Sequence, residues 1–241
     1  MKTTITKLTV ILFLATFVTS CGFDMLNRID GDRNVVSKKR KINDDFTRVK
    51  VSNGLDLYIK QGSKTSLTVE ADENLHEIII TEVKGGVLKI YTDRNIRRAK
   101  ARKVYLTVTT LEELKATSGS DVFSENTIKA NDLEVSTSSG ADMRIEVDAD
   151  NVTSRSSSGA DLRISGIANS HSANASSGSS IHAYNLKSKN VTAKVSSGAD
   201  ISVFATESIN ARASSGGDIR YKGSPEKVNK KTSSGGGVSS R

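Results

Sequence analysis

The sequence is short of several residue types that commonly stabilise or mark a fold. Its 241 residues include one cysteine, one proline and no tryptophan, and aromatic side chains account for only 5%. Because Cys21 is the only cysteine, no disulfide can form within the chain. With so few aromatic residues, any core must be built from the aliphatic side chains that recur throughout the sequence. That regular recurrence excludes an intrinsically disordered composition.

Long apolar runs are also missing, and the run near the start is short. Residues 8–17 are mainly apolar and follow two lysines, whereas a transmembrane helix needs roughly 20 residues. About ten residues suit the apolar region of a cleavable signal peptide. Residues 18–21 read Val-Thr-Ser-Cys, a lipobox pattern in which small residues enter the peptidase and the thiol accepts diacylglycerol. We therefore predict a signal peptide over residues 1–20, lipidation of Cys21 and an anchor made of lipid alone.

The segment after the predicted cleavage site, residues 21–45, is polar, highly charged and without a clear period. We expect it to be a flexible tether that lifts the folded part off the membrane. Its basic run at residues 38–41 suggests contact with anionic headgroups as an alternative role. The predicted location is the cell envelope, with the lipid anchor in the outer membrane and the protein on its periplasmic or its surface face.

A short serine-glycine phrase dominates the sequence from residue 116 onward. It recurs seven times, and its glycines lie 18 to 21 residues apart. The segments around it carry apolar residues at every second position, as half-buried strands do. The glycines of the phrase are Gly119, Gly140, Gly159, Gly178, Gly198, Gly216 and Gly235.

This repeat predicts an all-β fold, a right-handed parallel β-helix or β-solenoid with coils of about 19 residues. Residues 116–241 form the coils in this interpretation. Residues 46–115 show the alternating apolar positions of strands but lack the serine-glycine phrase. We expect them to form an irregular region that caps the solenoid. At each corner the glycine takes a positive φ, and the flanking serines stack in a narrow inner corner.

The chain resembles a known family at several points. Residues 46–51 (Phe-Thr-Arg-Val-Lys-Val), 57–62 (Leu-Tyr-Ile-Lys-Gln-Gly) and 69–75 (Val-Glu-Ala-Asp-Glu-Asn-Leu), with the serial Ser-Gly-Ser/Ala-Asp corners, resemble the "putative auto-transporter adhesin, head GIN domain" family. The resemblance covers about residues 46–235. It implies an exported protein of the Bacteroidota group, a β-helix-like solenoid over residues 46–241 and an adhesive role, and it brings no established catalytic residues.

Five aspartates occupy one position of the repeated phrase and form a candidate binding ladder. Stacked carboxylates suit Ca²⁺, but we favour turn capping, in which each carboxylate accepts a backbone N–H. Ser180 and Gly237 interrupt the series, so we predict no cofactor and no metal site, with weak Ca²⁺ binding as the alternative. The five residues are Asp121, Asp142, Asp161, Asp200 and Asp218.

Signals for catalysis are weak. Parallel β-helix enzymes that act on polysaccharides set paired carboxylates, or a base and a metal, in a groove. Here the outward positions beside the corners vary, and two of them, Arg144 and Arg163, suggest exposed ion pairs with the aspartates. The histidines His76, His171 and His182 show no metal-ligand spacing. No nucleophile elbow, phosphate loop or zinc motif is present.

The densest basic cluster precedes a predicted strand. It suits a solvated loop, or a contact with anionic surface glycans or lipopolysaccharide phosphates. Aromatic residues are not interleaved with it, so we expect no nucleic-acid binding. Its residues are Arg94, Arg97, Arg98, Lys100, Arg102 and Lys103.

Together these features predict a membrane-anchored, non-enzymatic lipoprotein of the cell envelope. The leading hypothesis is an adhesin or a module that binds a glycan, an envelope protein or a host protein. A structural or assembly role in the periplasm is the first alternative, and a polysaccharide-active β-helix enzyme is the second. Oligomeric state stays open.

Overall fold

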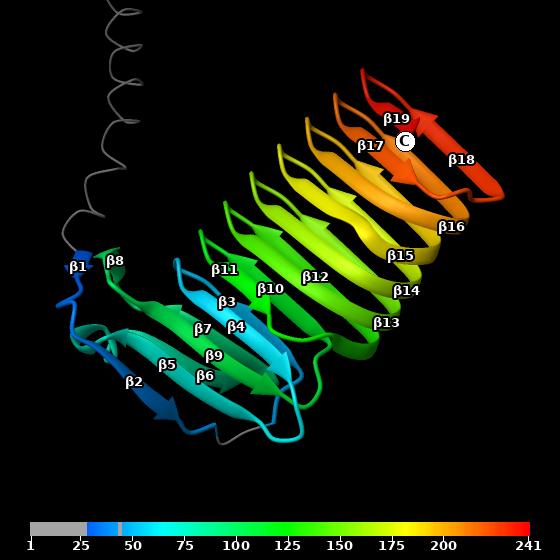
Figure 1. Cartoon of the computed structure of the whole chain (residues 1–241). Helices are drawn as coiled ribbons and strands as arrows, with labels where there is room; N and C mark the ends of the chain where they lie inside the picture. Colours follow the sequence, from blue (N-terminus) through cyan, green and yellow to red (C-terminus); the bar gives the residue numbers. More distant parts are fainter. Residues whose placement is uncertain (1–27, 43–44) are drawn as a thin grey trace, which may run out of the picture.

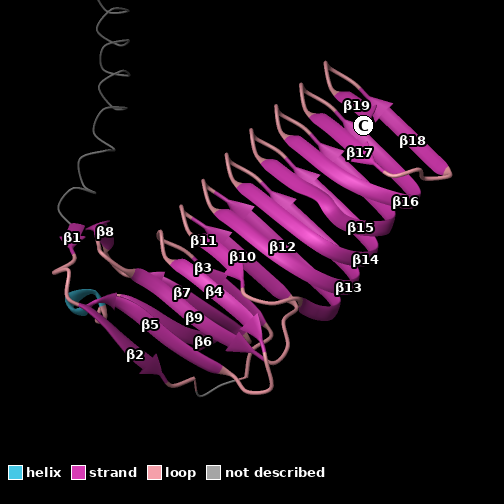
Figure 2. Ribbon diagram, in the orientation of Figure 1, coloured by secondary structure: helices cyan, strands magenta, loops and turns pink. Residues whose placement is uncertain are grey.

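The protein is a stack of β-coils that grows from a less regular N-terminal sheet region (Figures 1 and 2). The computed structural model describes residues 28–42 and 45–241, so the predicted signal peptide and Cys21 lie outside the described residues. Within these ranges the only helix is a single 3₁₀ turn, Glu73–Leu75, and no helix could cross a membrane. The predicted solenoid of parallel coils is confirmed.

The strands fall into two groups. The N-terminal strands are β1 (Arg28–Asp30), β2 (Val35–Arg40), β3 (Arg48–Val51), β4 (Asp56–Gln61), β5 (Ser66–Asp72), β6 (Ile79–Lys84), β7 (Val87–Thr92), β8 (Asn95–Arg98) and β9 (Arg102–Val108). The coils contain β10 (Glu113–Thr117), β11 (Asp121–Ser124), β12 (Ile128–Ser138), β13 (Asp142–Ser156), β14 (Asp161–Ala175), β15 (Ser180–Val195), β16 (Asp200–Ala213), β17 (Asp218–Lys222), β18 (Lys227–Thr232) and β19 (Gly237–Ser240).

Each coil contains two extended runs with one face inward. In β13 the residues at every second position from Met143 to Ala149 are buried, and those between them face outward. Asp150 and Asn151 are both exposed, which marks a corner, and the second run then restores the alternation. The next coil pairs in parallel with a shift of 19 residues, so that Asp142 lies beside Asp161. Like residues therefore stack about 4.8 Å apart.

The Ser-Ser-Gly phrase forms a tight two-residue turn that joins one coil to the next. Both central residues are left-handed, with φ +54° at Ser139 and +68° at Gly140. Ala141 N–H donates to Ser138 O at 3.3 Å across the turn, and Gly140 N–H donates to Ser158 O of the next coil at 3.2 Å. Two successive positive φ values are typical of a type I′ turn.

The prediction of positive φ is confirmed for all seven glycines of the phrase. The predicted inner corner is wrong, because the second serine and the glycine of the turn are exposed in every coil. Serine itself adopts the left-handed conformation seven times, which the sequence did not suggest. The residue after the glycine, Ala141 for example, enters the core instead.

The opening region continues both sides of the solenoid and then closes them with antiparallel strands. On one side β4 pairs in parallel with β11 and β9, and β9 pairs antiparallel with β5. On the other, β3 pairs in parallel with β10 and β7, and β7 pairs antiparallel with β6. The predicted irregular N-terminal β region is therefore present.

The predicted tether over residues 21–45 is wrong for much of its length. β2 pairs antiparallel with β5 over six residues, and β1 pairs in parallel with β8. A buried carboxylate fixes this segment. The Asp72 side chain accepts N–H groups from Arg33 at 3.1 Å, Lys100 at 3.0 Å and Ala101 at 2.9 Å. Burial alone would raise the pKa of Asp72, but these backbone donors outweigh it and lower the pKa.

Candidate ligand-binding face

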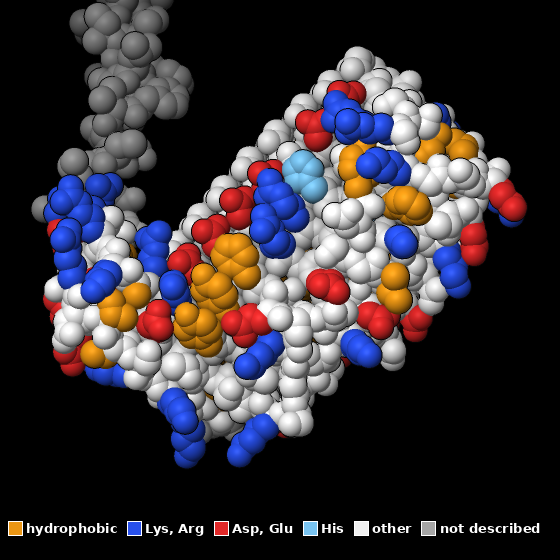
Figure 3. Space-filling view, viewed as in Figure 1, with side chains coloured by type: hydrophobic (Ala, Val, Ile, Leu, Met, Phe, Trp, Pro, Cys, Tyr) orange, Lys and Arg blue, Asp and Glu red, His pale blue; other side chains and the backbone are white. Residues whose placement is uncertain are grey.

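One side of the solenoid carries two parallel columns of outward side chains, both on the strand run that follows each Ser-Gly turn. The first column contains the predicted aspartate ladder. Asp121 pairs with Asp142, Asp142 with Asp161, and Asp200 with Asp218, while Ser180 separates the two groups and Gly237 ends the series. Figure 3 shows this ladder as a diagonal line of acidic side chains.

The ladder extends further than the repeated phrase indicated. Asp56 pairs with Asp121 and continues the column toward the N-terminus. It follows Asn53 and Gly54, whose φ values of +64° and +69° make an eighth turn of the same kind. Gly54 N–H donates to Ser118 O at 3.0 Å, so this turn stacks on the others. The Asn-Gly pair was the signal in the sequence that could have revealed it.

The two aspartates nearest the N-terminal region are the most perturbed. Burial raises the pKa of Asp56, against the opposing charges of Arg102 and Lys103. Burial also raises the pKa of Asp121, and the neighbouring carboxylates of Asp56 and Asp142 raise it further.

Turn capping by the aspartates is not observed, and that interpretation was wrong. Among the described residues, none of the five predicted carboxylates accepts a backbone N–H. The ion pairs predicted for Arg144 and Arg163 are also absent from the described part of the chain. Arg220 makes such contacts instead, at 3.2 Å to Asp200 and 3.6 Å to Asp218. All three side chains are nearly half exposed, so these pairs contribute little stability.

The second column lies two residues after the first and changes character along the solenoid. Tyr58 stacks against Tyr105, with ring centroids 5.2 Å apart, and against Phe123 at 5.4 Å. Phe123 pairs with Arg144, and the column continues through Arg163 to His182. Figure 3 shows this change as apolar side chains near β4 and β11, followed by basic side chains and a histidine.

Stacking along the column determines what the aromatic residues present to solvent. The two interplanar angles are 21° and 27°, so the rings cover one another's faces and turn their edges outward. The two columns together form a flat strip of ring edges, carboxylates, guanidinium groups and one imidazole. We call the two columns together the ladder face. The first column runs from Asp56 to Asp218, and the second runs from Tyr105 to Arg220.

A groove of about 670 Å³ runs along a different part of the coils. Its floor contains Ala149 and Ala168, its walls include Lys129, Asp148 and Ile167, and Ile167 is 53% exposed. Of the predicted site residues that the structure describes, none lines it.

The three histidines are not brought together. His76 and His171 are buried in different parts of the core, and His182 is exposed on the ladder face. No group of three or more His, Cys, Asp or Glu side chains that could hold a metal ion occurs in residues 28–42 or 45–241. The predicted basic cluster begins at Arg94, just before β8, and continues through β8 and the following segment to the start of β9. Arg97 forms an ion pair with Asp30 of β1.

Comparison with known proteins gives a family and a fold. The family described as "Putative auto-transporter adhesin, head GIN domain" matches residues 45–225. No curated protein matches the chain.

Solved structures share the whole architecture. A putative adhesin from Bacteroides fragilis has a TM-score of 0.83 at 24% identity, over 88% of this chain and 100% of that one. A putative lipid binding protein from Parabacteroides distasonis has a TM-score of 0.73 at 23% identity, over 89% and 99%. A putative adhesin from Parabacteroides merdae has a TM-score of 0.71 at 20% identity, also over 89% and 99%. At these identities the likeness concerns the fold.

Proposed function

Because the chain belongs to the "putative auto-transporter adhesin, head GIN domain" family, we propose that it is a lipid-anchored, non-enzymatic protein of the cell envelope that binds an extended glycan or protein segment along its ladder face. The lipobox ending at Cys21 supports the anchor, which we place in the outer membrane.

The observation that carries the proposal is the register of the ladder face. Hydrogen-bonding and charged groups repeat along it once per coil, at about 4.8 Å, because each pairs with the same position in the next coil. That repeat is similar to the length of one sugar unit in an extended polysaccharide. A repetitive ligand could therefore make the same weak contact with several coils at once, and linked contacts strengthen one another.

The chemistry of the strip favours a ligand with hydroxyl or acidic groups. The carboxylates accept hydrogen bonds from hydroxyls, and the guanidinium groups of Arg144 and Arg163 donate two parallel bonds to a carboxylate or sulfate. Both arginine side chains are exposed, and neither is in an ion pair within the described residues.

The binding experiment uses the full chain on an array of bacterial and host polysaccharides, followed by calorimetry with any ligand found. Replacing Arg144 and Arg163 by alanine should weaken binding at least tenfold while leaving the fold intact. The matched control replaces Lys194 and Arg212, two exposed cations on the other run of the coils, and should bind normally. Equal loss in both variants, or an array without any ligand, would count against the ladder face.

The anchor and location are tested separately. Metabolic labelling with a fatty acid should label the protein, and Cys21→Ser should abolish the label. Protease added to intact cells then distinguishes the two faces of the membrane. Digestion before lysis supports adhesion, whereas protection until lysis supports a ligand inside the envelope.

A structural role in envelope assembly is the second candidate, and the last coil favours it. All six residues of β18 are exposed, and Val228, at an inward position, is 45% exposed. Crosslinking in cells from a photoreactive residue at Asn229 should capture one stoichiometric envelope partner if assembly is the function. A polysaccharide-active enzyme would instead release products from a glycan, which a reducing-end assay measures.

A further inference from the structure

We propose that the N-terminal end of the solenoid docks onto a membrane surface that carries anionic phospholipid headgroups. This inference rests on the lipid anchor of the proposed function and adds the orientation of the protein on the membrane. The docking surface contains β1, β8 and the residues next to them in the chain, which together are residues 28–34 and 93–100.

The distance from the anchor is the first argument. Because β1 begins at Arg28, only six residues, 22–27, separate it from Cys21. Even fully extended, such a segment spans at most about 25 Å. The N-terminal end must therefore stay close to the membrane surface, whereas a tether of residues 21–45 would have let the domain move freely. The opposite end, at β18 and β19, lies roughly 34 Å along the stack from its first turn at Asn53 and Gly54.

The charge of this end is the second argument. Residues 28–34 and 93–100 contain six basic and three acidic side chains. Figure 3 shows basic side chains gathered where the described chain begins, over β1 and β8. Five of the six are arginines, whose guanidinium groups bind phosphate in a bidentate manner. The basic residues are Arg28, Arg33, Arg94, Arg97, Arg98 and Lys100.

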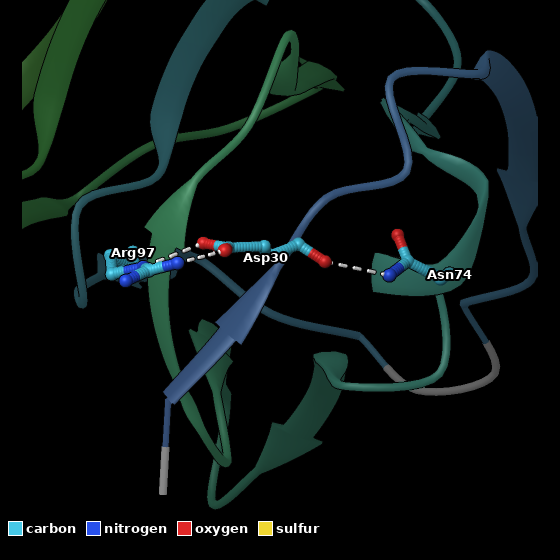
Figure 4. Close-up of polar contacts among 3 residues, drawn as sticks. All are labelled: Asp30, Asn74 and Arg97. Atoms are coloured by element: carbon cyan, nitrogen blue, oxygen red, sulfur yellow. Dashed lines mark hydrogen bonds and ion pairs between the residues drawn. The ribbon is translucent and has the colours of Figure 1, made fainter. Parts of the chain in front are cut away.

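The third argument is that the strands that carry these cations are fixed to each other and to the rest of the fold by hydrogen bonds. Arg97 pairs with Asp30 through two guanidinium hydrogen bonds, and Asn74 Nδ2 donates to Asp30 O at 2.8 Å (Figure 4). Gly31 N–H donates to Arg98 O at 2.7 Å, which joins β1 firmly to β8.

The pairing of Arg97 with Asp30 neutralises one of the three acidic side chains. In the described chain, the side chains of Arg28, Arg33, Arg98 and Lys100 are exposed and form no ion pair. They remain available for headgroup phosphates.

The experiment uses the mature chain, residues 21–241 with Cys21→Ser, so that neither an attached lipid nor the apolar residues 8–17 can contribute. Binding is measured by co-sedimentation with vesicles of phosphatidylcholine alone and of phosphatidylcholine with phosphatidylglycerol. The protein should bind only the anionic vesicles, and added salt should release it. Replacing Arg28, Arg98 and Lys100 by glutamine should weaken binding roughly a hundredfold, since each basic residue near an anionic surface contributes a factor of about five.

The far end of the solenoid supplies the matched control. Residues 222–241 contain five basic residues and one acidic residue, so charge alone would attract that end as well. The control replaces Lys227, Lys231 and Arg241 by glutamine and should bind almost as tightly as the parent. Equal losses in the two triple variants would overturn the proposal, because binding would then follow total charge. Binding to neither vesicle would also overturn it, whatever fatty-acid labelling shows for Cys21.

Discussion

At the scale of single residues, the most consequential buried group is His171. Its ring lies inside the core between Val152 and Val191, and its Nε2 is 2.8 Å from Ser154 Oγ. Burial lowers its pKa from the ordinary value of 6.5 to about 4. The ring is therefore neutral in the folded protein at physiological pH.

This burial predicts that the protein loses stability in mild acid. Below about pH 6.5 the unfolded chain binds a proton at His171 that the folded protein does not bind until about pH 4. The free energy of unfolding should therefore fall as pH decreases between these values, by up to about 3 kcal/mol from this group. Urea unfolding at a series of pH values measures the slope.

The matched variant replaces both members of the buried pair, His171→Val with Ser154→Ala. These are the residue types found at neighbouring coils, where Val191 and Ala173 occupy the same columns. The variant should keep the fold and lose most of the acid sensitivity between pH 6.5 and 4. An unchanged slope would assign that sensitivity to other groups, such as His76, whose pKa burial also lowers.

Gly166 gives a second prediction at this scale. Its φ is +114°, and a Cβ there would lie 1.8 Å from the backbone oxygen of Val147 in the preceding coil. Gly166→Ala should destabilise the protein by about 3–5 kcal/mol, because the backbone itself must move. Gly140→Ala is the comparison, since its Cβ would meet nothing and only the strain of a positive φ remains, about 1–2 kcal/mol. Chemical denaturation of both variants should show this order.

At the scale of elements, the Ser-Gly turn is the unit that repeats. Serine, its first central residue, is not the residue type that best tolerates the positive φ found there. Asparagine tolerates a left-handed backbone better than serine, and Asn53 already occupies that position in the first turn. We expect Ser139→Asn and Ser158→Asn each to raise the free energy of unfolding by about 0.5 kcal/mol. Thermal unfolding of the single and double variants checks both the sign and the additivity.

The control for the turn is the same substitution in a strand. Ser136 lies in β12 with extended backbone, where asparagine is disfavoured, so Ser136→Asn should lower stability. A gain at all three positions would mean that asparagine stabilises the solenoid through side-chain hydrogen bonding, independently of turn geometry.

The same elements show how far sequence reasoning reaches. The coils could be predicted because alternation and glycine spacing repeat, and each copy supports the others. The strand β2 could not, since its sequence Val-Val-Ser-Lys-Lys-Arg has no strict alternation and its partners in β5 lie 27 to 37 positions further along the chain. The turn at Asn53 does not follow from the repeat, because asparagine occupies the position at which the other seven turns have serine.

The ladder face was predictable only in part for a related reason. The aspartates recur at one position of the phrase, so their column followed from spacing alone. Tyr58 and Tyr105 belong to irregular segments whose relative register no repeat defines, and only the pairing of β4 with β9 and β11 brings them beside Phe123. Contacts between repeated coils can be predicted from the sequence, whereas contacts between segments that occur only once cannot.

At the scale of the whole molecule, the two ends of the solenoid differ. The N-terminal end closes with the antiparallel strands β2, β5, β6 and β7, whereas the C-terminal coil has no strand beyond it in the described chain. An unpaired parallel edge can add further strands and lead to self-association. Lys230 stands at this edge in an inward column that otherwise contains Ala193 and Ala211. Its ammonium lies 4.9 Å from the centre of the Tyr221 ring.

We expect Lys230 to keep the solenoid from stacking end to end, since a charge at an inward position cannot be buried by a second molecule without a large desolvation cost. Lys230→Val should therefore produce concentration-dependent dimers, which sedimentation velocity detects. The measurement uses the mature chain, residues 21–241 with Cys21→Ser, to avoid association through lipid or through the apolar residues 8–17. Lys231→Val is the control, because Lys231 faces outward on the same strand. It removes the same charge but leaves the lysine at the inward position in place. If both variants stay monomeric, the exposed β18 edge does not itself drive association, and its openness then favours the binding of a different envelope partner.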